Sequence, residues 1–199
     1  MSRRSSLALA LALATLPVAQ AAPGSRAAPE KGIAEKAPRK VPTLDDLYVR
    51  LKEIEDPAEA KGVARLIEQR LDRSGSATVD LLTGRARQAM AARDFALAAE
   101  LMDRATSLSP SWSEGWNRRA TVFWLLSDKG EAVADLQRAL VLEPRHFEAW
   151  SALGKIYQSM DDDARALAAY RRALAIYPTM ESVKEAVDRL APSVDGRDL

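Results

Sequence analysis

The stretch EPRHFEAW, residues 143–150, holds the side chains of this sequence that come closest to a reactive cluster. It contains His146, the only histidine of the chain, between Glu143 and Glu148. A zinc site takes three or four ligands from histidine, cysteine and carboxylate groups, and the chain has no cysteine. No serine forms a recognisable nucleophile motif with His146, so acyl-transfer chemistry is not indicated either. His146 is therefore expected to be packed or hydrogen-bonded at a corner of the fold, with a protonatable contact to Glu143 or Glu148 as the alternative.

The run Asp161-Asp162-Asp163 is a second group of side chains that suggests a ligand, in this case calcium. It lacks the alternating ligands and the closing glutamate of a dedicated calcium loop. Acidic residues also begin helices, where they accept hydrogen bonds from free backbone N–H groups, and this interpretation is favoured. The glycines are isolated, so no phosphate-binding loop is indicated. We therefore expect no catalytic, cofactor-binding or metal-binding residues and predict that the protein is not an enzyme.

The composition is typical of one modest helical domain. Of 199 residues, 47% are hydrophobic and 29% are charged, with 29 basic side chains against 28 acidic ones. This near-neutral balance lacks the basic footprint of a nucleic-acid-binding protein. Without cysteine, disulfide bonds, thiol chemistry and a lipid-modified cysteine are excluded. The apolar residues recur at intervals of three and four, as in amphipathic helices, so an all-α fold is predicted.

The first residues have the pattern of a signal peptide, which we assign to residues 1–21. Arg3 and Arg4 precede an apolar run at residues 7–16, and Ala19-Gln20-Ala21 has the small-x-small spacing that signal peptidase accepts. The run is about half of the ~20 residues that a membrane-spanning helix needs, so stable membrane insertion is not predicted. Cleavage near Ala21 would make the protein periplasmic or secreted. General secretion is favoured, and twin-arginine export is the alternative.

Residues 22–42 are predicted to form a disordered linker. They are rich in Ala, Pro, Lys, Arg and Glu and show no apolar periodicity, as in segments that bury little surface. The folded domain should therefore begin near residue 43.

The rest of the chain repeats itself with a period of 34 residues, which separates Pro110, Pro144 and Pro178. Small residues keep the same spacing in three sets: Ala86, Ala120 and Gly154; Ala98, Ala132 and Ala166; Ala105, Ala139 and Ala173. This period predicts units of two antiparallel helices, each ended by a proline that cannot continue the preceding helix. In the third unit the helices should cover residues 147–160 and 164–177. Gly154 should face Ala166 there, so that the two backbones can approach closely.

The third unit resembles a known family. Its residues Trp150-x-x-Leu153-Gly154-x-x-Tyr157, followed by Ala166, Tyr170, Ala173 and Pro178, are similar to the signature of the tetratricopeptide repeat (TPR). The resemblance implies an α-solenoid of about three repeats, at residues 79–110, 113–144 and 147–178. We expect a degenerate helix pair at 44–73, a capping helix at 179–190 and a flexible tail at 191–199, so that the TPR domain covers 43–190. The chain also looks like a small exported TPR protein of alphaproteobacteria.

In this family the first helices of the repeats line a concave groove that holds partner peptides or domains, and the resemblance implies the same use here. The groove is expected to present Arg87, Met90, Asn117, Thr121, Trp124, Ser151, Lys155 and Gln158. Trp124 follows another aromatic residue, so its ring either faces the groove as an anchor or packs against a neighbouring helix. Arg87 and Lys155, with Asn117, either bind a partner carboxylate or are solvated surface groups.

Two departures from the family pattern are informative. The positions that chaperone-binding members use for a carboxylate clamp carry Thr83, Arg118 and Glu148 here, so that specialised role is not predicted. Arg119 stands where the third repeat has a core leucine, and a half-buried arginine needs a carboxylate partner. We predict a structural ion pair from Arg119 to Asp135 or Glu143 that holds adjacent repeats in register.

The favoured function is therefore a non-catalytic periplasmic scaffold or adaptor whose partners are other envelope or periplasmic proteins. The alternative is a permanent structural subunit of a cell-envelope assembly, or a self-associating protein whose groove is filled by a second copy. A stable homo-oligomer in solution would favour the alternative, and a monomer would favour the first hypothesis.

Overall fold

The computed structural model describes residues 41–196 of the chain. The predicted signal peptide and all but the last two residues of the predicted linker lie outside the described residues. The described part contains helices and no strands: α1 (Leu44–Glu53), α2 (Pro57–Leu71), α3 (Ala77–Ala91), α4 (Phe95–Leu108), α5 (Ser113–Leu125), α6 (Lys129–Leu142), α7 (Phe147–Gln158), α8 (Asp163–Ile176) and α9 (Glu181–Asp195). None of these helices is both long enough and apolar enough to cross a bilayer.

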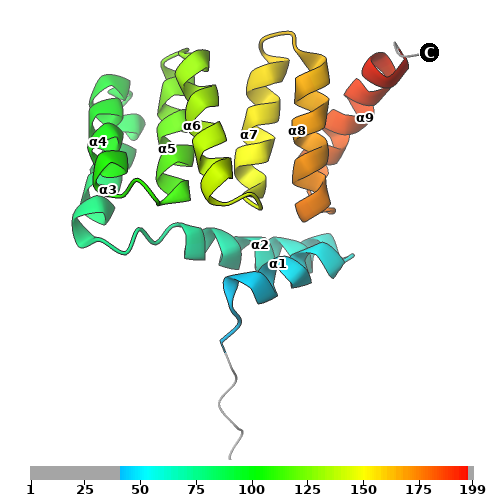
Figure 1. The fold of residues 1–199 in the computed structure, drawn as a ribbon, viewed down its shortest axis with the longest axis horizontal. Helices are drawn as coiled ribbons and strands as arrows, with labels where there is room; N and C mark the ends of the chain where they lie inside the picture. Colours follow the sequence, from blue (N-terminus) through cyan, green and yellow to red (C-terminus); the bar gives the residue numbers. More distant parts are fainter. Residues whose placement is uncertain (1–40, 197–199) are drawn as a thin grey trace, which may run out of the picture. The chain divides into compact units, whose positions relative to one another are not determined.

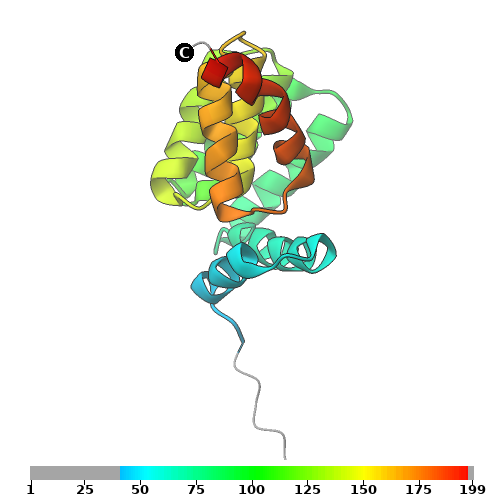
Figure 2. The ribbon, with the colours of Figure 1, turned by 90° about the vertical axis from the view of Figure 1, so that its right-hand side faces the viewer.

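Three antiparallel helix pairs, α3–α4, α5–α6 and α7–α8, stand side by side, and α9 packs against the last of them (Figure 1 and Figure 2). The predicted all-α solenoid is thereby confirmed. Inside each pair the second helix contributes an alanine with no exposed surface, namely Ala98, Ala132 and Ala166. Because a methyl group is all that separates the helices there, each pair is tightly packed.

The turn inside each repeat uses the same backbone geometry. Arg93, Ser127 and Asp161, one repeat apart, have positive φ angles of 61°, 63° and 58°. The next residue is an aspartate in each case, and its carboxylate caps the second helix by accepting a backbone hydrogen bond. In the Asp161-Asp162-Asp163 run, the side chain of Asp162 accepts from the backbone N–H of Arg165. This run therefore begins a helix, as the sequence indicated.

Gly154 is small for a reason other than the predicted one. A Cβ atom at this position would lie 2.5 Å from the ring of Tyr170, so the close neighbour is an aromatic side chain of α8 and not Ala166. Real Cβ atoms do not approach other heavy atoms so closely. The glycine thus makes room for the Tyr170 ring between α7 and α8.

The C-terminal helix is longer than predicted. The sequence placed a capping helix at 179–190 and a flexible tail from 191, but α9 continues through Pro192 to Asp195. Arg171 of α8 pairs with Asp195 at 2.5 Å, and Val194 packs against the core of the third repeat. These contacts hold the last turn although Pro192 removes one backbone hydrogen bond.

The N-terminal hairpin, formed by α1 and α2, does not stack as a further repeat in the row. It lies crosswise beneath the ends of the other helices (Figure 1 and Figure 2). Its apolar residues Leu47, Leu51, Val63 and Ile67 form one cluster with Phe147 and Tyr177 at the junctions of the third repeat. A capping box between Thr43 and Asp46 begins α1. The predicted pair at 44–73 therefore exists as two helices, but it covers the ends of repeats instead of the face of the first one.

The close contact between Gly154 and Tyr170 predicts that a larger residue at position 154 destabilises the protein. Replacing Gly154 with alanine should lower the free energy of unfolding by about 1–3 kcal/mol, because the new methyl group overpacks the helix pair. Gly84, in the middle of α3, has no atom within 4 Å of its Cβ position, so Gly84→Ala should raise the free energy of unfolding by about 0.5–1 kcal/mol. Urea denaturation followed by circular dichroism measures both changes, and equal effects of the two substitutions would contradict the packing explanation.

Candidate partner-binding groove

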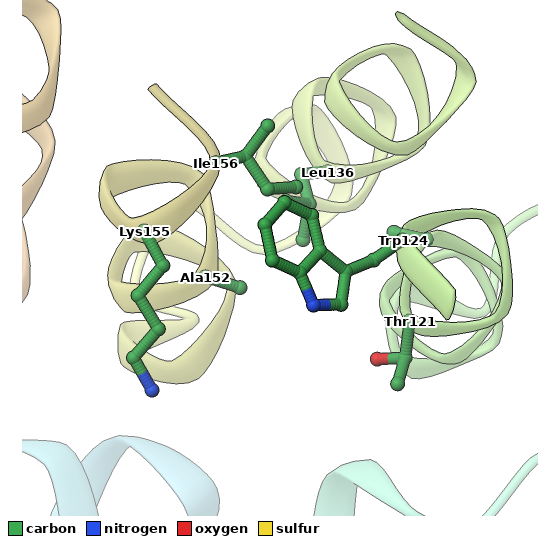
Figure 3. Close-up of a pocket in the computed structure, with 7 residues that line it drawn as sticks. Thr121, Trp124, Leu136, Ala152, Lys155 and Ile156 are labelled. Atoms are coloured by element: carbon green, nitrogen blue, oxygen red, sulfur yellow. The ribbon is translucent and has the colours of Figure 1, made fainter. Parts of the chain in front are cut away.

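Two small pockets open on the face made by the first helices of the repeats. The tryptophan pocket, between α5 and α7, has a volume of about 110 Å³ and is lined by Ala120, Thr121, Trp124, Leu136, Ala152, Lys155 and Ile156 (Figure 3). The methionine pocket, between α3 and α5, also measures about 110 Å³ and is lined by Thr83, Ala86, Arg87, Met90, Met102, Arg118 and Thr121. Thr121 lines both pockets, so the two lie next to each other on one surface.

The two pockets are the same structural site made twice. Six of the residues that line the methionine pocket have counterparts 34 positions later in the tryptophan pocket: Ala86 and Ala120, Arg87 and Thr121, Met90 and Trp124, Met102 and Leu136, Arg118 and Ala152, Thr121 and Lys155. Each pocket has an apolar floor from the second helix of a repeat and walls from two successive first helices. The period of the sequence therefore produces equivalent pockets in successive repeats.

Trp124 both packs and remains accessible. In Figure 3 its indole reaches from α5 toward α7 and lies beside Ala152 and Ile156. The residue keeps 39% of its surface exposed. Within the described part of the chain its indole N–H has no hydrogen-bond partner, whereas those of Trp112, Trp116 and Trp150 donate to backbone carbonyls. The ring thus packs against α7 and also leaves part of its surface open to the pocket, and its role as an anchor stays a prediction.

The accessible charges beside the pockets are positive. Arg87 and Lys155 are exposed, and neither forms an ion pair with any residue that the structure describes. Arg118, by contrast, pairs with Glu114 at 2.8 Å and with Asp72, the residue that follows α2. The rims of the two pockets therefore keep one free cation each, suited to a carboxylate.

Three of the predicted groove residues line neither pocket. The side-chain amide of Asn117 donates to Glu114 at 3.0 Å, and the Gln158 side chain accepts from the hydroxyl of Tyr170 at 3.2 Å. Ser151 is buried, with 3% of its surface exposed. The apolar floor formed by Met102 and Leu136 was not predicted, although both occupy corresponding positions of the repeat and could have been found from the period.

His146 is buried at the corner between the second and third repeats. Its Nδ1 atom accepts from the backbone N–H of Ala149 at 3.4 Å and so caps α7, and Nε2 lies 3.0 Å from a carboxylate oxygen of Glu114. Because Nδ1 is an acceptor, Nε2 carries the proton and donates to Glu114. The sequence named Glu143 or Glu148 as the contact, but Glu143 binds Arg145 instead. The contact with Glu114 of α5 could not be read from local spacing.

Glu114, His146 and Glu148 lie close enough for one ion, with their potential ligand atoms within 4.8 Å of one another. The proton on Nε2 faces Glu114, so this imidazole has no free lone pair to offer a metal. Burial alone would raise the pKa of Glu114, but the hydrogen bond from His146 and the positive charge of Arg118 lower it below its usual range. Burial, together with Glu68 and Glu114, raises the pKa of Glu148 to about 7. Glu114 and His146 thus form a hydrogen-bonded pair inside the fold, and Glu148 lies beside it.

Arg119 forms an ion pair inside the solenoid. Its guanidinium donates two hydrogen bonds to Asp135 of α6, at 2.8 and 2.7 Å, and a third to Asp103 of α4 at 2.8 Å. The same group lies 4.7 Å from the centre of the Trp116 ring. Since Asp103 belongs to the first repeat and Asp135 to the second, Arg119 connects two adjacent repeats. Glu143, the other predicted partner, does not contact it.

Comparisons with known proteins agree with this architecture. The sequence profile of the tetratricopeptide repeat matches residues 147–180. A TPR repeat-containing protein of Rhizobium etli is 34% identical over 131 residues, which are 66% of this chain and 63% of the relative. The chain thus spans somewhat less than two thirds of the length of that curated relative.

Solved structures of low sequence identity share the fold. The TPR domain of Sgt2 from Aspergillus fumigatus superimposes with a TM-score of 0.57 at 22% identity, covering 62% of this chain and 83% of that domain. The first TPR domain of Spaghetti (RPAP3), solved with the HSP90 peptide SRMEEVD, gives a TM-score of 0.56 at 15% identity, covering 59% and 94%. At these identities the likeness concerns the fold alone.

The Arg119 contact predicts a large loss of stability on substitution. Arg119→Met would leave the carboxylate of Asp135, whose side chain is 3% exposed, buried without a partner, so the free energy of unfolding should fall by about 3–5 kcal/mol. Arg104→Met, which removes an exposed pair with Glu100, should cost less than about 1 kcal/mol. Urea denaturation measures both, and adding Asp135→Leu to Arg119→Met should recover part of the loss. A loss below about 1 kcal/mol for Arg119→Met would contradict the role of the pair.

Proposed function

We propose that this chain, in which residues 147–180 match the tetratricopeptide repeat, is a non-catalytic scaffold that binds a partner protein in the groove formed by its two pockets. The observation that carries the proposal is the repetition of one pocket in register on α3, α5 and α7. Each pocket measures about 110 Å³, well below the roughly 300–1,000 Å³ of sites that enclose a small molecule. Pockets of this size, placed in a row, fit successive side chains of one polypeptide.

The chemistry of the pockets indicates which side chains they take. Apolar groups fit against the floors made by Met102 and Leu136, and the accessible face of Trp124 offers a rigid aromatic contact of the kind that dominates binding energy at interfaces. Arg87 and Lys155 have no internal partners among the described residues and are available to carboxylates of the partner. The partner segment should therefore alternate apolar and acidic groups.

This groove does not resemble the carboxylate clamp of chaperone-binding tetratricopeptide repeat proteins. Two of the three positions concerned are engaged in internal contacts, since Arg118 pairs with Glu114 and Asp72, and Glu148 lies at the contact with α2. A neighbour such as the Spaghetti (RPAP3) domain, which was solved with an HSP90 peptide, supports peptide binding by the fold but not this choice of peptide.

We further propose that the protein acts in the periplasm, or outside the cell, on other exported or envelope proteins. The support is the signal-peptide pattern of residues 1–21 and the linker composition of 22–42 in the sequence. The competing hypothesis, a self-associating protein or a permanent subunit, predicts that the groove is already occupied. Size measurement of the purified mature protein by light scattering distinguishes them, because a groove filled by a second copy requires a stable oligomer.

Substitution of Trp124 should identify the groove as the binding surface. A photo-crosslinking amino acid placed at Arg87 or at Lys155 in the source cell should capture the same protein, and one placed at Arg104, which lines neither pocket, should not. Trp124→Ala should weaken binding of that protein by roughly 30-fold, as for a central aromatic anchor. Leu125→Ala is the matched control, since Leu125 is 40% exposed, much like Trp124, and lines neither pocket. Equal affinities of the two variants, measured by calorimetry, would exclude Trp124 as the anchor.

The proposed location is tested by the mature N-terminus. Cleavage after Ala21 should give a protein that begins at Ala22 and is released with the periplasmic or extracellular fraction. Intact-mass spectrometry of the protein isolated from each fraction measures this. An uncleaved chain that starts at Met1 and remains in the cytoplasm would contradict export.

A further inference from the structure

The N-terminal hairpin contacts the end of the groove through a small set of polar bonds. The indole N–H of Trp112, just before α5, donates to the backbone carbonyl of Leu71 at the end of α2, at 2.7 Å. Asp72 pairs with Arg118 of α5, and Asp45 of α1 pairs with Arg145 at 2.7 Å. These bonds, with the apolar cluster around Phe147 and Tyr177, dock the hairpin on the first turns of α5 and α7.

The contact also contains three carboxylates in a partly buried crevice. Glu68 of α2, Glu114 of α5 and Glu148 of α7 influence one another electrostatically. A pocket of about 530 Å³ between α2, the start of α7 and the start of α9 is lined by Glu68 and Glu148. Glu148 forms no hydrogen bond or ion pair with any side chain in the described range, whereas Glu114 has three partners, in Asn117, Arg118 and His146. Ionised Glu148 would thus be an uncompensated charge at the docking surface.

The charged groups around Glu148 come from every element packed on the crevice. They are Lys61, Arg65 and Glu68 from α2, Glu114 and Arg118 from α5, His146 at the cap of α7, and Glu181 at the start of α9. Arg118 is already bound to two carboxylates, and His146 donates to Glu114. The cations of the crevice are therefore shared among more carboxylates than they can neutralise.

We propose that the hairpin is a proton-controlled latch on the end of the groove: it docks most firmly while Glu148 is neutral and loosens when Glu148 ionises. Docking covers the first turns of α5 and α7, and Arg118, which pairs with Asp72, also lines the methionine pocket. The link between hairpin and solenoid is short and contains Gly75, whose φ angle of 78° is the left-handed conformation that glycine adopts without strain. Such a latch requires that the hairpin separate from the repeats while these stay folded.

The direction of the pH dependence follows from the docked and undocked environments. Burial beside Glu68 and Glu114 raises the pKa of Glu148 to about 7 when the hairpin is docked, and undocking returns the carboxyl to water and to an ordinary pKa near 4.5. A group whose pKa is higher in the docked state than in the undocked state favours docking. This contribution is fully present when the pH is below the pKa of the undocked state, and it is lost as the pH rises through the pKa of the docked state. Burial also raises the pKa of Glu68, so ionisation of Glu68 likewise weakens docking as the pH rises. Glu114 has a lowered pKa, so its opposite contribution is lost only below the ordinary carboxyl range.

The indole N–H of Trp112 reports docking directly, because its hydrogen bond to Leu71 exists only in the docked state. Its hydrogen exchange in the full mature chain can be followed by NMR between pH 5.5 and 8, with rates corrected for the intrinsic exchange of free indole. The opening constant should increase on the order of 30-fold over this range as Glu148 ionises. The backbone amide of Ala173, buried in α8, serves as the control within the same sample and should show a nearly constant opening constant.

Two substitutions complete the test. Glu148→Gln keeps the shape of the side chain and removes its titration, so most of the pH dependence of the Trp112 opening constant should be lost and only the contribution of Glu68 should remain. Glu185→Gln removes one exposed carboxylate of α9 and should leave the dependence of the wild-type chain unchanged. Trp112 protection that does not vary with pH in the wild-type chain overturns the latch, whatever the variants do. A pH dependence in Glu148→Gln as large as that of the wild-type chain overturns the assignment to Glu148.

Discussion

The close approach of the two helices in each repeat is the constraint on which the rest of the structure depends. Ala98, Ala132 and Ala166 are completely buried, and larger side chains there would push the second helix away from the first. The second helix also supplies the floor of each groove pocket, through Met102 and Leu136. The same packing that stabilises a repeat thus sets the depth of the binding surface. Because every repeat obeys it, the pockets recur in register.

The two pockets occupy equivalent positions of the repeat but have different walls, so the two ends of the groove are not the same. Met90 is flexible and polarizable where the next repeat has the rigid indole of Trp124, and Arg118 stands where the next repeat has Ala152. The two pockets therefore present two distinct surfaces. The ion pair of Arg119 with Asp135 and Asp103 fixes the two repeats relative to each other, and so fixes the distance between the pockets.

The contact between the hairpin and the repeats contains interactions that favour docking and interactions that oppose it. Burial of Phe147 and Tyr177 with the apolar residues of α1 and α2 favours docking. The crowding of Glu68, Glu114 and Glu148 opposes it, and only Glu114 has compensating hydrogen bonds. His146 belongs to this balance, since it caps α7 and holds Glu114 at the same time. The corner at EPRHFEAW is therefore a place where two repeats and the hairpin meet.

The sequence by itself determined the repeat. The period, the helix pairs, the aspartate that caps each second helix and the groove positions of Trp124, Thr121, Lys155, Arg87 and Met90 all follow from local spacing, because each repeat contacts mainly its neighbours. Only the tertiary structure decided where the hairpin lies, that Glu114 binds His146, that Tyr170 fills the space at Gly154 and that α9 continues past Pro192. These contacts join residues that no period relates, such as Asp45 and Arg145, 100 positions apart. Their side chains meet because the solenoid brings the ends of several repeats onto one surface, and such a surface exists only after the repeats have packed.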